Sequence, residues 1–465
     1  MFQKGKKSSP LTGGLSIMIV GCGKVGKTLV ERLSKEGHDI SVVDKSAARL
    51  QSVTNMYDVF GVVGNGASFT VLKEAGIEHT DILIAVTDSD ELNLLCCLVA
   101  KRSGNCDVIA RVRTPDYSEE KTYLKEKLGL AMMINPEQEA ANAISRILYM
   151  PTALDVAPFA RGHVEMVRIK LPEGNVLTGK RIADLGSELS GAVLICAVER
   201  SGEVYIPGGN FELAAGDVIS FIAPVRDGRK FLKRNGFHTH QVKSCIIVGG
   251  GRAAYYLGKR LIELGISVQI VENKKERCEE LSVLLPQAIV VNGDGTSEEL
   301  LNEIGITTTE SLVPLTGIDE ENIMLTLYAK EVSDAKVVTK INRITYTGVI
   351  DQLDLGSVVY PKYITSEAII AFVRSKTATM NNNIETMIHL FDERVEAIEF
   401  VVGDQSPVVN VPLADLKLKS NLLVACINHR GKVLIPDGND VIQGGDTVII
   451  VTTNTGFHDI EDILR

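Results

Sequence analysis

The chain repeats one plan twice, and this duplication limits the available folds more than any other feature. The segment IVGCGKVGKTLVERLSKEGHDISVVD, which begins at Ile19, aligns with IVGGGRAAYYLGKRLIELGISVQIVE, which begins at Ile247, at an offset of 228 residues (247 − 19). Further along, GNG at 64–66 matches GDG at 293–295 at an offset of 229 (293 − 64). Two copies of 229 residues account for 458 of the 465 positions, so one fold should occur twice.

Each half has two parts with different residue patterns. In the first part, β-branched runs alternate with helical patterns, which is typical of βαβ units around a parallel sheet. In the first half these runs are 17–20, 40–43, 59–63, 82–86, 108–112 and 131–134. A helical stretch follows at Pro136, and then strand-like segments alternate with Gly and Pro turns. The predicted class is α/β, with two Rossmann-like doubly wound parallel-sheet domains, each followed by a small α+β domain.

The same changes of residue pattern define the predicted domain boundaries. They are 14–136 for the first doubly wound domain, 137–155 for a connecting helix and linker, 156–238 for the first small domain, 243–361 for the second doubly wound domain, 362–384 for its connecting helix, and 385–465 for the second small domain.

Composition excludes several classes of protein. The net charge of −10 (49 − 59) argues against a general attraction to nucleic acid or anionic lipid. The longest apolar run, 191–198, is too short to cross a bilayer, and the N-terminus lacks the apolar stretch of a secretory signal, so we expect a cytoplasmic location. The eight cysteines show no CxxC and no zinc spacing, so we expect buried thiols in a reducing compartment and no metal site.

A glycine-rich loop follows the first β-branched run of each half. GCGKVG at 21–26 and GGGRAA at 249–254 fit the G-x-G-x-x-G/A pattern between a strand and a helix. The first glycine permits a tight turn, the second lets the backbone approach a pyrophosphate, and the third position allows helix and strand to pack closely. The loops therefore predict phosphate binding at two helix N-termini.

An acidic residue ends the second β-branched run of each half. Asp44 lies 18 residues beyond the loop (44 − 26), and Glu272 lies at the matching place in the second half. A carboxylate there can accept hydrogen bonds from an adenosine ribose, and it would repel a 2′-phosphate. NAD, ATP and ADP are therefore favoured over NADP.

Further polar residues follow later strands. Asn65 and Asp294 lie in the GNG and GDG turns, Thr87-Asp88 and Thr316 follow the fourth run, and Arg111 and Lys340 lie near the fifth. The carboxyl ends of parallel strands meet at one edge, where ligands bind. Ordinary turn chemistry and surface arginine remain the alternatives for these residues.

With the loops, acids, turns and the run AVTDSDELN/PLTGIDEEN present twice, the chain resembles the TrkA family, the cytoplasmic regulatory subunits of Trk-type potassium uptake systems. It is similar to a tandem of RCK (regulator of potassium conductance) units. The resemblance implies nucleotide-binding residues in both halves: Gly21, Cys22, Gly23, Lys24, Val25, Gly26, Asp44, Asn65, Thr87, Asp88 and Arg111, and then Gly249, Gly250, Gly251, Arg252, Ala253, Glu272, Asp294, Thr316 and Lys340.

The resemblance also implies a function and partners. NAD or NADH would bind, ATP or ADP being alternatives, in a ring of four chains on the inner face of the cell membrane. The ring would regulate K⁺ flux through a potassium-translocating membrane subunit. An NAD-dependent oxidoreductase with duplicated dinucleotide-binding domains is the alternative, but no histidine is shared between the copies as a candidate acid or base. We therefore predict binding without catalysis.

Overall fold

The computed structural model describes residues 14–185, 192–342, 350, 353–377, 383–391 and 393–465. The chain divides into two compact units. One comprises Met1–Pro136 with Ala368–Thr377, and the other comprises Glu137–Glu367 with Ala378–Arg465. The first parallel sheet therefore lies in one unit, and the second parallel sheet and both antiparallel sheets lie in the other.

The first parallel sheet has the strand order β3-β2-β1-β4-β5-β6. Its central strand is buried because Ile17, Met18 and Ile19 are covered on both faces. The order reverses between β1 and β4, so the loops after these strands diverge and leave a crevice. The elements are β1 (Ser16–Val20), α1 (Lys24–Lys35), β2 (Asp39–Asp44), α2 (Ala47–Thr54), β3 (Phe60–Val63), α3 (Phe69–Glu74), η1 (Ile77–His79), β4 (Ile82–Ala85), α4 (Asp90–Ser103), β5 (Asp107–Arg111), α5 (Pro115–Glu119), α6 (Lys121–Leu128) and β6 (Met132–Ile134).

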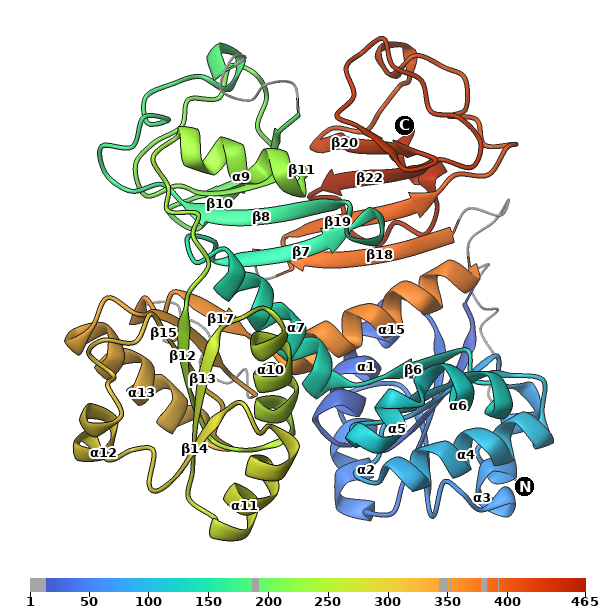
Figure 1. The fold of residues 1–465 in the computed structure, drawn as a ribbon. Helices are drawn as coiled ribbons and strands as arrows, with labels where there is room; N and C mark the ends of the chain where they lie inside the picture. The colour runs from blue at the N-terminus through green and yellow to red at the C-terminus, as the bar shows by residue number, and fades with distance from the viewer. Residues whose placement is uncertain (1–13, 186–191, 343–349, 351–352, 378–382, 392) are drawn as a thin grey trace. The chain divides into compact units, whose positions relative to one another are not determined.

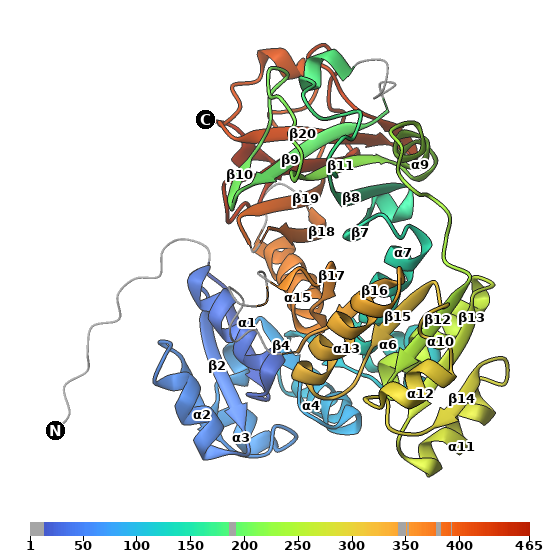
Figure 2. The ribbon, with the colours of Figure 1, turned by 90° about the vertical axis from the view of Figure 1, so that its left-hand side faces the viewer.

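The second parallel sheet repeats this topology as β14-β13-β12-β15-β16-β17. Figure 2 shows α10 beside β13, as α1 lies beside β2 in the first half. The elements are β12 (Ser244–Val248), α10 (Arg252–Glu263), β13 (Ser267–Glu272), α11 (Lys275–Leu284), β14 (Ile289–Asn292), α12 (Glu298–Glu303), β15 (Ser311–Pro314), α13 (Asp319–Val332), β16 (Lys336–Lys340) and β17 (Ser357–Val359).

The helices that leave the two parallel-sheet domains are exchanged between the halves. Helix α7 (Pro136–Tyr149) buries Ile144 and Ile147 in the core of the second parallel-sheet domain, with Ile247 of β12. Helix α15 (Pro361–Thr377) places its last turns in the unit of the first parallel-sheet domain, where Arg374 pairs with Glu36. Each half thus supplies a helix to the other.

The second connecting helix is shorter than the predicted segment 362–384. Helix α15 ends at Thr377, residues 378–382 lie outside the described residues, and Asn383 and Ile384 belong to β18. Ile384 pairs with Phe400 of the neighbouring strand, so sheet pairing and not helical periodicity decides its conformation.

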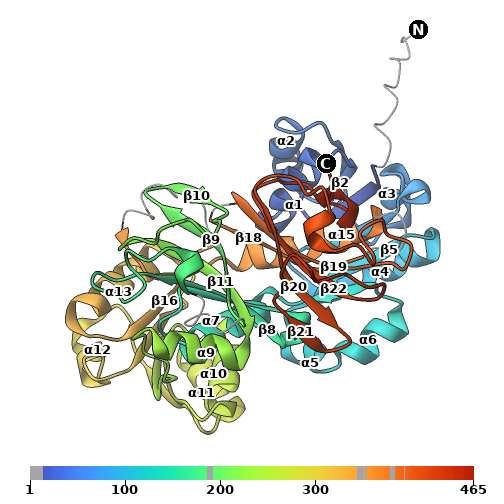
Figure 3. The ribbon, with the colours of Figure 1, turned by 90° about the horizontal axis from the view of Figure 1, so that it is seen from above.

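The two small domains each contain an antiparallel sheet, with the orders β10-β9-β11-β8-β7 and β18-β19-β22-β20-β21. They lie side by side (Figures 1 and 3) and share one apolar core that includes Phe159, Ile222 and Ile449. The predicted fold class is confirmed. The elements are β7 (Asp155–Phe159), η2 (Ala160–Gly162), β8 (Val164–Lys170), η3 (Ile182–Leu185), β9 (Leu194–Arg200), β10 (Glu203–Tyr205), β11 (Val218–Pro224) and α9 (Val225–Arg234), followed by β18 (Asn383–Leu390), β19 (Val395–Val401), η5 (Leu413–Asp415), β20 (Leu422–His429), β21 (Lys432–Leu434), β22 (Thr447–Thr452) and η6 (Ile460–Ile463).

Candidate functional site

The glycine loops lie at the crevices where the strand order reverses. Gly21 has φ = +108° and Gly249 has φ = +100°, a region that residues with a side chain rarely adopt. A Cβ atom on Gly21 would also come within 3.0 Å of the backbone nitrogen of Thr87. The first glycine of each loop is therefore required by both conformation and space.

The helices that follow the loops begin without a capping side chain. Gly23 is the N-cap of α1 and Gly251 is the N-cap of α10. A Cβ atom at either glycine would meet nothing within 4 Å, so the space in front of the first helical turn is open. The N–H groups of a first turn and the helix dipole attract anions, so each glycine loop with its helix start forms a cradle that could accept an anion such as a phosphate group.

The acid after the second strand binds its own glycine loop in both halves. Asp44 accepts hydrogen bonds from the amides of Cys22 (2.6 Å) and Ser46 (2.8 Å). Glu272 accepts from the amides of Gly250 (2.8 Å) and Lys274 (2.8 Å). Each carboxylate oxygen keeps a further lone pair, so the same group can also accept from a ligand hydroxyl. The acids hold the loops in place and face the open crevice.

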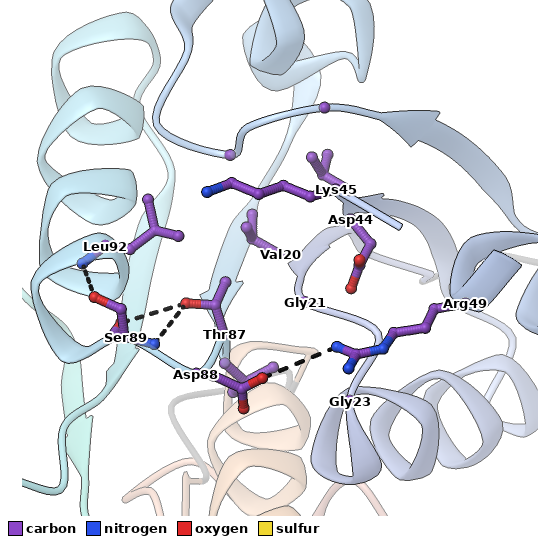
Figure 4. Close-up of a pocket in the computed structure, with 14 residues that line it drawn as sticks. Val20, Gly21, Gly23, Asp44, Lys45, Arg49, Thr87, Asp88, Ser89 and Leu92 are labelled. Atoms are coloured by element: carbon purple, nitrogen blue, oxygen red, sulfur yellow. Dashed lines mark hydrogen bonds and ion pairs between the residues drawn. The ribbon is translucent and has the colours of Figure 1, made fainter. Parts of the chain in front are cut away.

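The first half contains two adjoining cavities, of about 330 Å³ and about 430 Å³. The first is lined by Asp44 and Thr87 and by the apolar side chains of Val20, Val43 and Leu92 (Figure 4). The second lies at the start of α1 and is lined by basic side chains. Of the residues predicted from the sequence, Gly21, Cys22, Gly23, Lys24, Val25, Asp44, Thr87, Asp88 and Arg111 line one or both cavities.

The second half contains one larger cavity of about 830 Å³ at the equivalent place. Its polar wall differs, because Glu321 replaces Leu92 and Gly317 replaces Asp88 at an offset of 229 (321 − 92 and 317 − 88). Of the predicted residues, Gly249, Gly250, Gly251, Glu272, Asp294, Thr316 and Lys340 line this cavity.

Four predicted residues do not line these three cavities. Gly26 lies beneath the loop, where a Cβ atom would come within 1.9 Å of the carbonyl oxygen of Gly21. The Asn65 side chain accepts a hydrogen bond from the amide of Ala67 (3.2 Å) within its own turn. Ala253 is buried in the core, and Arg252 is exposed outside the cavity. The loop pattern specifies their backbone positions and not the direction of their side chains.

An arginine missed in the sequence lines the cavity of each half. Arg49 on α2 borders both first-half cavities, and Arg277 on α11 borders the second-half cavity and donates to the carbonyl oxygen of Gly250 (2.7 Å). The two occupy equivalent positions (277 − 49 = 228), five residues after the acids. This repeated spacing was the available signal.

The repeated DExN run supports the cavity wall from behind. Asn93, fully buried, accepts from the amide of Thr87 (2.8 Å) and donates to the carbonyl oxygen of Arg111 (2.8 Å). Asn322 joins Thr316 to Lys340 in the same way (2.9 Å and 3.0 Å). The asparagine therefore couples the loops after two neighbouring strands.

Buried groups near the first cavities have shifted pKa values. Burial raises the pKa of the Cys22 thiol to about 12, so this residue contributes its amide and not a thiolate. Burial opposes ionisation of Asp90, but hydrogen bonds from Arg113 and Thr114 outweigh it and lower the pKa of that carboxyl group. The ionised Asp90 carboxylate therefore holds the beginning of the loop that follows β5.

Charge is distributed differently in the two halves. In the first, the Asp88 carboxylate lies 3.5 Å from Arg111 Nη2 and 3.9 Å from Arg49 Nη1 (Figure 4 shows the Arg49 pair). In the second, Lys340 replaces Arg111 and donates to the carbonyl oxygen of Leu315 (3.0 Å).

Groups typical of acid–base and metal catalysis were sought in the three cavities and in the described residues. The cavity linings include no histidine that could serve as an acid or base beside a nicotinamide ring. Within the described ranges, no group of three or more His, Cys, Asp or Glu side chains is placed to hold a metal ion. No helix in the described part of the chain is both long and apolar enough to cross a bilayer.

Comparison with protein families matches both domain types twice. The TrkA-N domain family matches residues 17–136 and 245–361, and the TrkA-C domain family matches residues 166–236 and 397–465. These matches cover most of the chain and follow its duplicated order.

Similar proteins align with nearly the whole length of this chain. The chain is 32% identical to "Trk system potassium uptake protein TrkA" of Halomonas elongata, over 97% of this chain and 99% of the relative. It is 29% identical to "Trk system potassium uptake protein TrkA homolog 2" of Methanosarcina mazei, over 97% of this chain and 100% of the relative. These names describe potassium uptake and not oxidoreductase activity.

Solved structures share the fold at lower identity. "Crystal Structure of the GsuK RCK domain" matches with a TM-score of 0.63 and 18% identity, covering 98% of this chain and 96% of that chain. "GsuK channel bound to NAD" matches with a TM-score of 0.62 and 19% identity, covering 96% of this chain and 78% of that chain. From the paired domain matches and the full-length relatives, the chain belongs to the TrkA family of Trk system potassium uptake proteins.

Proposed function

We propose that this chain is a nucleotide-responsive regulatory subunit of a Trk potassium uptake system. It binds an adenine nucleotide, NAD(H) or ATP/ADP, in each half and alters K⁺ flux through a potassium-translocating membrane subunit. It acts as a ring of four chains on the cytoplasmic face of the membrane. The domains keep the predicted boundaries, except that the second connecting helix ends at Thr377 and β18 begins at Asn383. The family membership supports the potassium system, and the NAD named for the GsuK channel supports the ligand class.

The observation that carries the proposal is the cradle built twice from the same parts. In each half, an acid holds a glycine loop, an uncapped helix begins behind it, and an arginine five residues after the acid borders the cavity. The carboxylate suits the ribose, and the helix start with its arginine suits the phosphates. Binding energy that differs between two ring conformations can shift their populations without any reaction.

The second glycine of each loop offers a direct test. Gly23→Asp and Gly251→Asp place a carboxylate in open space at an N-cap, where aspartate is favoured, so both variants should fold. The same carboxylate bonds the first-turn amides and opposes a ligand phosphate. Like charges about 4 Å apart near a protein surface repel by about 4 kcal/mol, so binding in the altered half should weaken at least about a hundredfold.

Calorimetric titration of the full chain with NAD, NADH, ATP and ADP measures this effect. Each single variant should lose one binding site per chain, and the double variant should lose both. Gly23→Ser is the matched control, because it caps the helix with a neutral side chain and should weaken binding far less. Nucleotide binding that is indifferent to Gly23→Asp and Gly251→Asp would refute the assigned cradles.

The regulatory part is tested with the membrane partner. Potassium uptake into vesicles containing the translocating subunit should respond to this protein and to added nucleotide, and the double variant should not transmit the nucleotide response. Uptake that is unaffected by both protein and nucleotide would remove the regulatory assignment. Steady NADH oxidation with a small substrate would instead favour the oxidoreductase.

A further inference from the structure

The phosphate end of the first-half site is strongly basic. Lys24, Lys27, Arg49 and Arg111 line the cavity at the start of α1 together with one acid, Asp88. The helix N-terminus adds positive potential at the same place. Such a cavity attracts anions, and the carboxylate of Asp88 already lies at this end of the site.

Asp88 reaches both guanidinium groups at this end of the site. Its two carboxylate oxygens divide between them, with Oδ1 3.5 Å from Arg111 and Oδ2 3.9 Å from Arg49. Arg49 comes from α2 and Arg111 from the end of β5, so the carboxylate bridges two walls of the site. Figure 4 shows Asp88 and Arg49 directed toward each other.

The backbone around Asp88 is held independently of its side chain. Thr87 is tied to Asn93 through its amide and hydroxyl groups, and the carbonyl oxygen of Asp88 accepts a hydrogen bond from Arg113. The Asp88 side chain itself is 82% exposed. It can therefore leave the two arginines by rotating, without movement of the loop.

We propose that Asp88 is an internal competitor for ligand phosphate, which occupies Arg49 and Arg111 in the free protein and is displaced when a phosphate-bearing nucleotide binds the first half. This inference rests on the proposed function. It assigns Asp88 a role opposite to that of a ligand-contacting group, because its charge lowers the affinity for anions. The second half has Gly317 in this position, and the additional acid that lines its cavity, Glu321, stands at the place of Leu92 instead.

The competitor selects among ligands by their charge. A neutral nucleoside that fills only the Asp44 side of the site does not need the two arginines, so Asp88 does not affect it. A diphosphate or dinucleotide must take the place of the carboxylate. Pairs of this exposure contribute up to about 1 kcal/mol, which is about a fivefold change in affinity.

Titration of the full chain carrying Gly251→Asp, which leaves only the first half able to bind, tests the proposal. The probes are ADP in the presence of EDTA and uncharged adenosine. Asp88→Asn should tighten ADP binding about fivefold and change adenosine binding less than twofold. Asp88→Glu keeps the charge and should stay within twofold of the unsubstituted protein for both.

The second half supplies the converse test. In a chain carrying Gly23→Asp, Gly317→Asp should weaken ADP binding about fivefold, because a Cβ atom at Gly317 meets nothing within 4 Å and the new carboxylate has room. Unchanged or weaker ADP binding in Asp88→Asn overturns the competitor while leaving the proposed function standing. Absence of ADP and adenosine binding in every version of the chain overturns both.

Discussion

The exchange of connecting helices predicts that one ion pair strongly stabilises the first unit. Arg374 of α15 is only 3% exposed and donates two hydrogen bonds to Glu36 Oε1, at 3.0 Å from Nε and 2.6 Å from Nη2. Glu36 is the C-cap of α1. The pair thus fastens the last turns of a helix from the second half to the first parallel-sheet domain.

Removing one partner should cost far more than removing both. Arg374→Met leaves the Glu36 carboxylate, whose side chain is only 12% exposed, without this arginine, and the loss of one partner costs about 3–5 kcal/mol in buried pairs. His38, whose Nε2 lies 3.7 Å from Glu36, offers partial compensation and places the expectation near the lower end, about 3 kcal/mol. The double variant Arg374→Met/Glu36→Leu removes both members of the pair and should be within about 1 kcal/mol of the unsubstituted chain.

Hydrogen exchange resolves this effect within the large chain, because the amides of 361–377 report local opening. Amides in the last turns of α15 should lose protection in Arg374→Met and regain it in the double variant. Arg181→Met is a matched control, since Arg181 forms an exposed pair with Asp184 and should change nothing measurable. A loss below about 1 kcal/mol in Arg374→Met, or a double variant that costs the sum of the singles, would refute the reasoning.

Three further predictions concern the cradle and pH. Gly26→Ala forces a Cβ atom within 1.9 Å of the Gly21 carbonyl oxygen, so denaturant unfolding should show about 1–3 kcal/mol of destabilisation, whereas Ala254→Gly at the equivalent place should cost only about 1 kcal/mol. Hydrogen bonds from Arg113 and Thr114 lower the pKa of Asp90 despite its burial, so the ionised carboxylate should stabilise the fold fully above about pH 4. This stabilisation should be lost as the pH falls through the lowered pKa. Asp90→Asn should therefore lose less stability than the unsubstituted chain on acidification, and the same pH dependence of unfolding in both would contradict the prediction. Burial lowers the pKa of Lys336 from 10.5 to about 8. Between about pH 8 and pH 10.5 the unfolded chain therefore binds more protons than the folded chain, and the free energy of unfolding should rise with pH by at most about 3 kcal/mol. Lys336→Met should abolish this rise, as measured by denaturant unfolding at a series of pH values.

Much of the site follows from local patterns that repeat. The glycine loop, the acid and the polar residues after the fourth and fifth strands lie on one sheet edge, because all parallel strands end there. Arg49 and Arg277 lie on helices, where a single sequence offers no reason to single out one arginine. Their shared distance from the acids was informative, but only the structure shows them at the cavities.

The duplication, the class of each domain and the position of the two glycine loops could be predicted from the amino-acid sequence, because they depend on strand and helix periods and on backbone positions that favour glycine. The domain cores into which α7 and α15 pack could not be predicted, since an apolar helix face does not specify its partner. The pairing of Asp88 with Arg49 and Arg111 is likewise visible only in the folded chain, because these residues are distant in sequence and come close only when the sheet brings their strand ends together.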